Sequence, residues 1–229
     1  MIKLSLVIPT YNEAKNLPLL IKEIFEIIDK SKINLEVIIV DDNSPDKTGQ
    51  VAEELAKSYP ITVINRPGKL GLGSAVREGF KRSNRDYLGV MDGDLSHDPK
   101  IMNELILSLE NFDLTIGSRF KQGSLVEEWV LWRRFVSNLG VKLGRWLTGV
   151  DDSLSGYFFL RKKVIENITL TTGGYKILLE ILMKGNYNKI KEIPYTFRMR
   201  KYSTSKLNLK EFLLFFMQVI KFAFIKYGK

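Results

Sequence analysis

Short runs of apolar residues alternate along the first half of the chain with longer amphipathic stretches. The runs have the length of strands and read "KLSLVIP" at 3–9, "LEVIIV" at 35–40, "ITVIN" at 61–65, "DYLGVM" at 86–91 and "DLTIGS" at 113–118. Between them, apolar residues recur at helical spacing around 15–30, 47–58, 72–83 and 99–110. Continuously apolar strands are typical of parallel sheets that are buried on both faces and connected by right-handed helical crossovers. The pattern predicts an α/β fold with a Rossmann-like, mostly parallel sheet flanked by helices.

The second half of the chain has a different pattern. Residues 129–149 have helical spacing, 151–165 predict a turn and a strand leading into a short helix, and 189–200 alternate like a strand. Residues 208–229 predict an amphipathic C-terminal helix, and its apolar run is shorter than the roughly 20 residues that a membrane span needs. Because no linker rich in Pro, Gly or Ser interrupts the chain, we expect a single domain over 1–229.

Polar or glycine-rich loops follow the first four predicted strands, where open parallel sheets bind their ligands. The loops read "PTYNE" (Pro9–Glu13), "DDNSPDKT" (Asp41–Thr48), "NRPGKLGLGSA" (Asn65–Ala75) and "DGDLSHDP" (Asp92–Pro99). The glycine-rich loop fits neither a P-loop nor a dinucleotide fingerprint, because Ser74 follows Gly73 directly and Val76 follows Ala75. It predicts a tight turn that opens a helix, and phosphate binding by its backbone N–H groups stays open.

Asp92 and Asp94 stand two residues apart at the end of a predicted strand, so their side chains point to the same side. Two like charges repel there unless a cation joins them, and hard oxygen ligands are what Mg²⁺ or Mn²⁺ prefers. We therefore interpret the pair as a metal site. His97, the chain's one histidine, fits a base, a ligand or an ordinary polar loop residue equally well.

Charge divides the chain into two unlike halves. Residues 1–118 carry 14 Lys and Arg against 18 Asp and Glu, whereas 119–229 carry 21 against 8, within a net charge of +9. The first half is suited to cations and the second to anions such as a phosphorylated substrate, a nucleic acid or an anionic membrane face. The absence of cysteine excludes disulfides and cysteine-based zinc sites or nucleophiles.

Six blocks in this order resemble the family 2 glycosyltransferases of the GT-A fold. They are "VIPTYNEAKNL", "VIIVDDNSPDKT", "NRPGKLGLGSAVREGF", "MDGDLSHDP", "GSRF" and "SGYFFLRK". More narrowly, they are similar to the branch that contains dolichol-phosphate mannosyltransferase and its polyprenyl-phosphate relatives. The resemblance covers nearly the full chain.

The resemblance implies that residues 1–118 bind a nucleotide sugar, usually GDP-mannose, with Mg²⁺ or Mn²⁺ held by Asp92 and Asp94. Ser96, where some relatives offer Gln, would complete the metal's shell directly or through water. Gly93 would let the backbone approach the diphosphate. The implied nucleoside contacts are Pro9, Tyr11, Glu13, Asp41 and Asp42, with turn capping as the alternative for the last two.

For residues 119–207 the resemblance implies an acceptor site for dolichyl or another polyprenyl phosphate. The implied phosphate contacts are Arg119, Arg133, Ser137, Arg200 and Lys206. The residues that the resemblance implies for catalysis are Asp92, Asp94 and the three arginines. Asp152 and Glu180 would bind sugar hydroxyls or pair with these arginines. The C-terminal helix would hold the enzyme peripherally on the cytosolic face of a membrane, alone or with small membrane partner proteins.

We therefore expect a metal-dependent, inverting glycosyltransferase that moves a hexose, mannose from GDP-mannose, onto a polyprenyl phosphate. One alternative is a family 2 enzyme that uses a UDP-sugar, such as a polyprenyl-phosphate glucosyltransferase. The other is a basic nucleic-acid-binding or membrane-binding protein on a degenerate fold. That alternative would leave Asp92 and Asp94 idle, so we expect no nucleic-acid partner.

Overall fold

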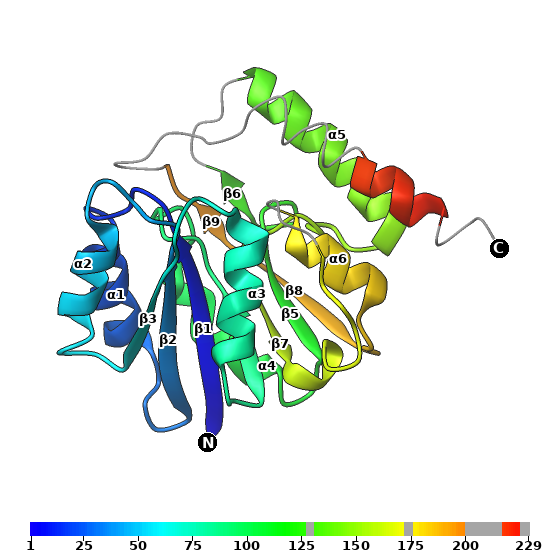
Figure 1. Cartoon of the computed structure of the whole chain (residues 1–229). Helices are drawn as coiled ribbons and strands as arrows, with labels where there is room; N and C mark the ends of the chain where they lie inside the picture. Colours follow the sequence, from blue (N-terminus) through cyan, green and yellow to red (C-terminus); the bar gives the residue numbers. More distant parts are fainter. Residues whose placement is uncertain (127–130, 172–175, 200–216, 225–229) are drawn as a thin grey trace.

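A computed structural model of the chain describes residues 1–126, 131–171, 176–199 and 217–224, and the side chains within these ranges except 126 and 131–139. The predicted alternation of strands and helices is confirmed in the first half, where each element lies within a few residues of its hydrophobic run (Figure 1). The elements are β1 (Ile2–Thr10), α1 (Leu17–Ile27), β2 (Ile33–Asp41), α2 (Thr48–Leu55), β3 (Ile61–Asn65), α3 (Leu72–Arg82), β4 (Tyr87–Val90), the 3-10 turn η1 (Pro99–Ile101), α4 (Met102–Ser108) and β5 (Leu114–Ser118).

The second half contributes shorter strands and one long helix. Its elements are β6 (Leu125–Val126), α5 (Leu131–Thr148), β7 (Phe158–Arg161), η2 (Lys162–Val164), α6 (Ile177–Lys184), β8 (Ile190–Pro194) and β9 (Thr196–Phe197). The single strand expected over 189–200 is therefore interrupted between β8 and β9, and β9 pairs with β6 in a separate two-stranded sheet. Of the expected C-terminal helix, residues 217–224 are helical and the rest lies outside the described residues.

The main sheet has seven strands in the order β3-β2-β1-β4-β7-β5-β8. All neighbouring strands are parallel except β7, which runs antiparallel to both β4 and β5. The order places β1 between β2 and β4, so the loops that follow these strands emerge at one edge of the sheet. The predicted mostly parallel α/β sheet is confirmed.

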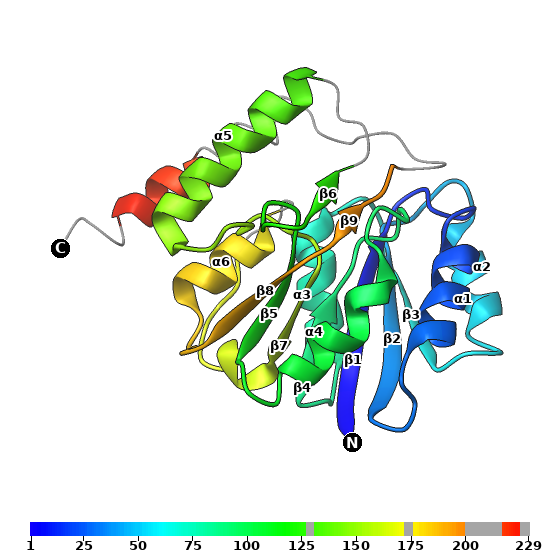
Figure 2. The same ribbon diagram turned by 180° about the vertical axis from the view of Figure 1, so that it is seen from behind.

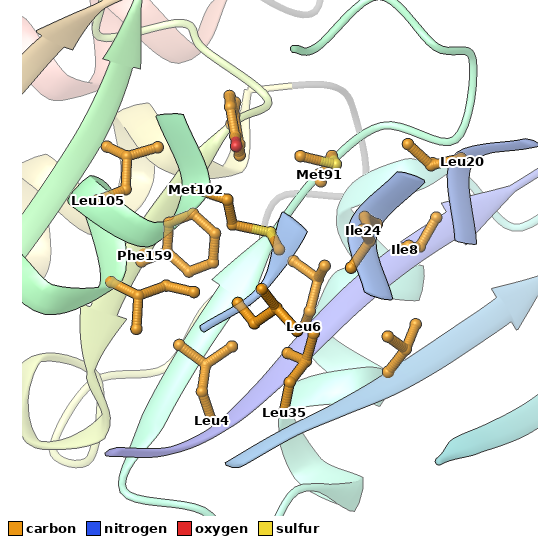
Figure 3. Close-up of a cluster of buried hydrophobic side chains, with 14 of the residues drawn as sticks. Leu4, Leu6, Ile8, Leu20, Ile24, Leu35, Met91, Met102, Leu105 and Phe159 are labelled. Carbon is orange, nitrogen blue, oxygen red and sulfur yellow. The ribbon is translucent and has the colours of Figure 1, made fainter. Parts of the chain in front are cut away.

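Alternate residues of the strands face two separate cores. Leu4, Leu6 and Ile8 of β1 pack with α1 and α4 on one face, a cluster to which Phe159 of β7 also belongs (Figures 2 and 3). Val7 points the other way and packs with α3 and α6. This alternation explains the continuously apolar runs, because both faces of the strands are covered by helices.

Residues 217–224 lie beside α5 at the edge of the molecule (Figure 1). Val219 and Phe222 are buried with residues of α5 and α6, whereas Met217, Ile220 and Phe224 are exposed. Among the helices in the described ranges, none has the length and apolar character needed to cross a bilayer.

Candidate active site

The loops after β1, β2 and β3 are tied together by hydrogen bonds. The N–H of Asn12 donates to Ser44 Oγ at 3.0 Å, the N–H of Glu13 to Thr48 Oγ1 at 2.9 Å, and the N–H of Arg66 to the carbonyl of Asp41 at 2.9 Å. The non-glycine residues with a positive φ in the described structure also lie in the loops at this edge, at Asn12, Asn43, Lys47 and Leu95. Strained backbone of this kind persists where surrounding contacts fix it, and it gathers at functional sites.

Asp41 is buried at the end of β2 and caps the turn that follows it. Its carboxylate accepts hydrogen bonds from the hydroxyl of Thr10 at 3.0 Å and from the N–H and hydroxyl of Ser44 at 2.9 and 2.6 Å. The turn-capping alternative for Asp41 is confirmed. A nucleoside contact by this residue stays a prediction.

Asp42 is also buried and lies against the glycine-rich loop. One carboxylate oxygen accepts from Arg66 Nη1 at 2.5 Å, and the other accepts from the N–H of Gly71 at 2.9 Å. Gly71 has a φ of +96° and immediately precedes α3, which explains why glycine stands at this turn. Because its N–H is engaged by Asp42, the structure favours the turn role of the loop over phosphate binding by this group.

The residues predicted from "PTYNE" line the same edge. Pro9 is buried in β1, and Glu13 is buried and accepts a hydrogen bond from Asn16 Nδ2 at 2.7 Å. Tyr11 is half-buried, and the ammonium of Lys69 lies 4.0 Å from the centre of its ring. This cation–π contact joins the loop after β1 to the loop after β3.

Asp92, Gly93 and Asp94 follow β4 after one intervening residue, Met91, at the centre of the sheet. Asp94 is buried, and its Oδ1 accepts from both the N–H and the hydroxyl of Ser96, at 3.1 and 2.5 Å. Asp92 is partly exposed, with a quarter of its side chain accessible. A Cβ added at Gly93 would lie 3.4 Å from Ile8 and Thr10, an ordinary contact, so the fold itself has room for a side chain there.

The two carboxylates and the hydroxyl are suited to a hard divalent cation that takes its remaining ligands from substrate phosphates and water. Two carboxylates and a hydroxyl stand within five residues, and Gly156, which precedes β7, leaves space beside Asp92: a Cβ there would lie 2.8 Å from both Asp92 carboxylate oxygens. Ser96 Oγ is directed at Asp94, so its first role is to orient that carboxylate. In the part of the chain that the structure describes, no group of three or more His, Cys, Asp or Glu residues is arranged to hold a metal ion.

Arg119 follows β5 and forms a buried ion pair with Asp152. Nε and Nη2 donate to the two carboxylate oxygens at 2.8 Å each, and the backbone N–H of Arg119 adds a third bond at 2.9 Å. Burial alone would lower the pKa of the guanidinium, but the charge and hydrogen bonds of Asp152 outweigh it and raise this pKa, to which Asp92 also contributes. Arg119 is therefore a fixed cation close to the carboxylate pair. Of the two roles predicted for Asp152, the structure shows pairing with one of the arginines, Arg119, and a contact with sugar stays a prediction.

Glu180 lies in α6 and makes a different set of contacts. Its buried carboxylate accepts hydrogen bonds from the N–H and hydroxyl of Thr171 and pairs with Lys184 one helical turn later. Within the part of the chain that the structure describes, the ion-pair partner of Glu180 is thus a lysine on the same helix and not one of the predicted arginines. A contact with sugar stays a prediction.

Four of the predicted contacts to the acceptor phosphate have side chains that lie outside the described part of the structure. Arg133 and Ser137 lie in α5, within the stretch whose side chains are not described, and Arg200 and Lys206 lie outside the described residues. The sequence analysis missed Glu192 in β8, whose carboxylate accepts the N–H groups of both Asp151 and Asp152 at 2.9 Å. No local pattern marks it, because its partners lie about 40 residues away.

Comparison with known proteins gives a consistent result. The family model described as glycosyl transferase family 2 matches residues 5–169. The chain is 43% identical over 215 residues to the dolichol-phosphate mannosyltransferase of Pyrococcus furiosus, covering 91% of this chain and 60% of that protein. It is 33% identical over 238 residues to the dolichol-phosphate mannosyltransferase of Saccharomyces cerevisiae, covering 99% of this chain and 89% of that one. The chain thus spans less than two thirds of the archaeal relative.

Among solved structures, the fold is similar to glucosyl-3-phosphoglycerate synthase from Mycobacterium tuberculosis in complex with Mn²⁺, UDP-glucose and phosphoglyceric acid. The TM-score is 0.72 at 19% identity, and the match covers 99% of this chain and 80% of the other. At this identity the likeness concerns the fold alone. It confirms the predicted GT-A architecture.

Proposed function

The chain belongs to glycosyl transferase family 2, and we propose that it transfers mannose from GDP-mannose to dolichyl or another polyprenyl phosphate, with a divalent cation and with inversion at the anomeric carbon. Support for mannose and for a lipid phosphate comes from the names of both curated relatives. Support for a cation comes from the oxygen-rich group at Asp92 and Asp94 and from the Mn²⁺ in the similar structure.

One observation carries the proposal: a single loop joins the carboxylate pair to the buried arginine. Residues 149–157 place Asp152 on Arg119 and, four positions later, Gly156 against Asp92. The carboxylates of Asp92 and Asp94, which would bind the cation, therefore lie close to the fixed guanidinium of Arg119. This is the arrangement that a reaction between two phosphorylated substrates requires.

The chemistry needs little acid–base help from the protein. A phosphate monoester has a second pKa near about 6, so its oxygen is already a nucleophile at neutral pH. A bound Mg²⁺ or Mn²⁺ would neutralise the charge that grows on the departing diphosphate. The protein's task is then to hold the acceptor phosphate in line with the anomeric carbon, which guanidinium groups do well because their planar fork gives two parallel hydrogen bonds.

Arg119 can hold the acceptor phosphate through one nitrogen of its guanidinium group, Nη1. Nε and Nη2 are engaged by Asp152, and within the described ranges Nη1 makes no hydrogen bond. The aromatic rings of Phe120 and Phe197 lie 5.6 and 5.4 Å from the guanidinium carbon and restrict its orientation. We expect Nη1 to donate to the acceptor phosphate, with Arg133, Ser137, Arg200 and Lys206 as further contacts.

The reaction would take place at a membrane, because the acceptor is a lipid, and we further propose its cytosolic face. The exposed apolar residues of 217–224 and the half-exposed Trp146 provide a surface that can lie at the lipid interface. Small membrane partner proteins would strengthen this attachment.

The test measures transfer of labelled sugar to a short polyprenyl phosphate, with GDP-mannose or UDP-glucose as donor and with Mn²⁺ or a chelator. We expect product from GDP-mannose with Mn²⁺ only. Transfer from UDP-glucose alone would replace the donor with that of the UDP-sugar alternative. No transfer from either donor, together with metal-independent binding of nucleic acid, would overturn the proposal in favour of a binding protein.

A further inference from the structure

His97 contacts Asp92 at two points. Its Nδ1 accepts the backbone N–H of Asp92 at 3.2 Å, and its Nε2 lies 3.8 Å from Asp92 Oδ2. Because Nδ1 is the acceptor, a neutral ring carries its proton on Nε2, the nitrogen that faces the carboxylate. The imidazole of His97 therefore lies next to both the backbone N–H and the carboxylate of Asp92.

Aromatic rings hold the imidazole of His97 in one plane. The ring of Tyr157 is stacked on it, with centroids 5.2 Å apart and an interplanar angle of 9°. Tyr195 and Phe197 meet it edge-on at 5.9 and 5.8 Å. Only 2% of the His97 side chain is exposed, so packing fixes its orientation before any ligand arrives.

The backbone bends sharply to bring His97 back to Asp92. Leu95 has a φ of +65°, a backbone conformation that a leucine adopts only under strain. The buried Leu95 side chain packs in the hydrophobic core, and the bonds from Ser96 to Asp94 close the same turn. The turn is therefore held in a strained form by two contacts from further along the chain: Ser96 hydrogen-bonds to the carboxylate of Asp94, and His97 accepts the backbone N–H of Asp92.

We propose that His97 is a positioning residue that presents the Asp92 carboxylate to the divalent cation. The inference rests on the proposed function, because it needs a cation at Asp92. Outer-shell partners that orient a metal-binding residue typically contribute a factor of about 10–100 to metal affinity, and His97 is such a partner through the backbone N–H of Asp92. His97 acts through its Nδ1 acceptor and its fixed plane, and it does not touch the substrates.

Two substitutions separate the effect of the hydrogen-bond acceptor Nδ1 from the effect of the aromatic ring of His97. His97→Phe keeps an aromatic ring in the stack but has no acceptor, whereas His97→Asn places an amide oxygen near the position of Nδ1 but loses the ring. We measure the binding of Mn²⁺ to the full chain in the presence of GDP, by the electron paramagnetic resonance signal of free Mn²⁺. The unfolding midpoint of each variant in urea is measured in parallel.

We expect His97→Phe to bind Mn²⁺ about 10–100-fold more weakly than the wild type and His97→Asn to recover most of that loss. The order of stability is expected to be the reverse, because Asn loses the stacking and volume that Phe keeps. A merely structural role would make Mn²⁺ affinity follow stability instead. If the Phe variant does not fold, His97→Leu provides a smaller side chain that also lacks the acceptor.

The outcomes distinguish the inference from the function on which it rests. Wild-type affinity for Mn²⁺ in both His97→Phe and His97→Leu, or affinities that follow the order of stability, would overturn the role of His97 and leave the proposed function intact. If the wild type itself does not bind Mn²⁺ with GDP, the cation requirement of the proposed function fails, and the role of His97 fails with it.

Discussion

Arg119 and Asp152 form a two-pronged ion pair across 33 residues of sequence, with both hydrogen bonds at 2.8 Å and no exposed surface on the carboxylate. Glu192 holds the other side of this arrangement, because it binds the backbone N–H of Asp152. Glu192, Asp152 and Arg119 are thus connected by a series of hydrogen bonds. For the phosphate contact that we propose for Arg119, a guanidinium held in this way would need little reorganisation.

Removing one member of the pair should destabilise the fold. Asp152→Asn leaves Arg119 largely buried without its counter-charge, and we expect the free energy of unfolding to fall by about 3 kcal/mol. Arg119→Met should have a similar effect, because it leaves Asp152 buried and charged. The double variant should lose less than the sum of the two, as measured by urea unfolding. Additive losses would show that the two side chains do not stabilise each other.

Asp94→Ala should abolish catalysis but leave the fold intact. Its carboxylate accepts hydrogen bonds from the N–H and the hydroxyl of neighbouring Ser96, within the same loop. We expect the rate of mannose transfer to fall by at least about 100-fold, the scale of losing one main electrostatic contact to the reaction. The labelled-mannose assay and the urea midpoint check the two halves of this prediction. Unchanged transfer would remove the metal role of Asp94.

Gly156→Ala should disturb Asp92 without changing its chemistry. The added Cβ would lie 2.8 Å from both carboxylate oxygens, closer than such atoms approach, so the carboxylate has to move. We expect Mn²⁺ affinity to drop by about ten-fold or more. Gly68→Ala is the matched control, because a Cβ at Gly68 meets nothing within 4 Å. Equal Mn²⁺ affinity in the two variants would contradict a cation at Asp92.

Local sequence predicted the first five strands well because most of them are buried on both faces, and the edge strand β3 is also apolar over most of its length. It did not predict that β7 enters the sheet antiparallel between β4 and β5, since the pairing of Gly89 with Phe159 joins residues 70 positions apart. A hydrophobic run states that a strand is buried but not which strand lies beside it.

For the site as well, the sequence predicted residues with a local pattern but not the contacts between distant residues. Asp92 and Asp94 carry a local signal, two carboxylates at a strand end. The pairing of Arg119 with Asp152 was one of two open alternatives, and only the fold decides between them. Glu192 carries no local signal, and the block "SGYFFLRK" contains Gly156 but does not indicate its contact with Asp92, because both roles depend on backbone and carboxylate groups that the fold brings close.

Asp113 should make the protein sensitive to acid. It stands just before β5, and its carboxylate accepts the N–H groups of Asn188 and Lys189 at 2.9 and 3.2 Å and pairs with Lys163 at 2.9 Å. Burial alone would raise its pKa, but the bonds from Asn188, Lys163 and Lys189 prevail and lower the pKa from 3.8 to about 2.

A lowered pKa in the folded state means that the charged carboxylate stabilises the fold above pH 4, and that this contribution is lost as the pH falls toward 2. The shift corresponds to at most about 2 kcal/mol. Asp113→Asn should lower the free energy of unfolding at pH 7 by up to this amount and flatten its decline between about pH 4 and pH 2. Lys163→Ala should reproduce only part of the effect, because that ammonium is half-exposed while the two backbone bonds remain. Urea unfolding at pH 7, 4 and 3 measures both variants, and an unchanged pH dependence in Asp113→Asn would show that other carboxylates govern the acid response.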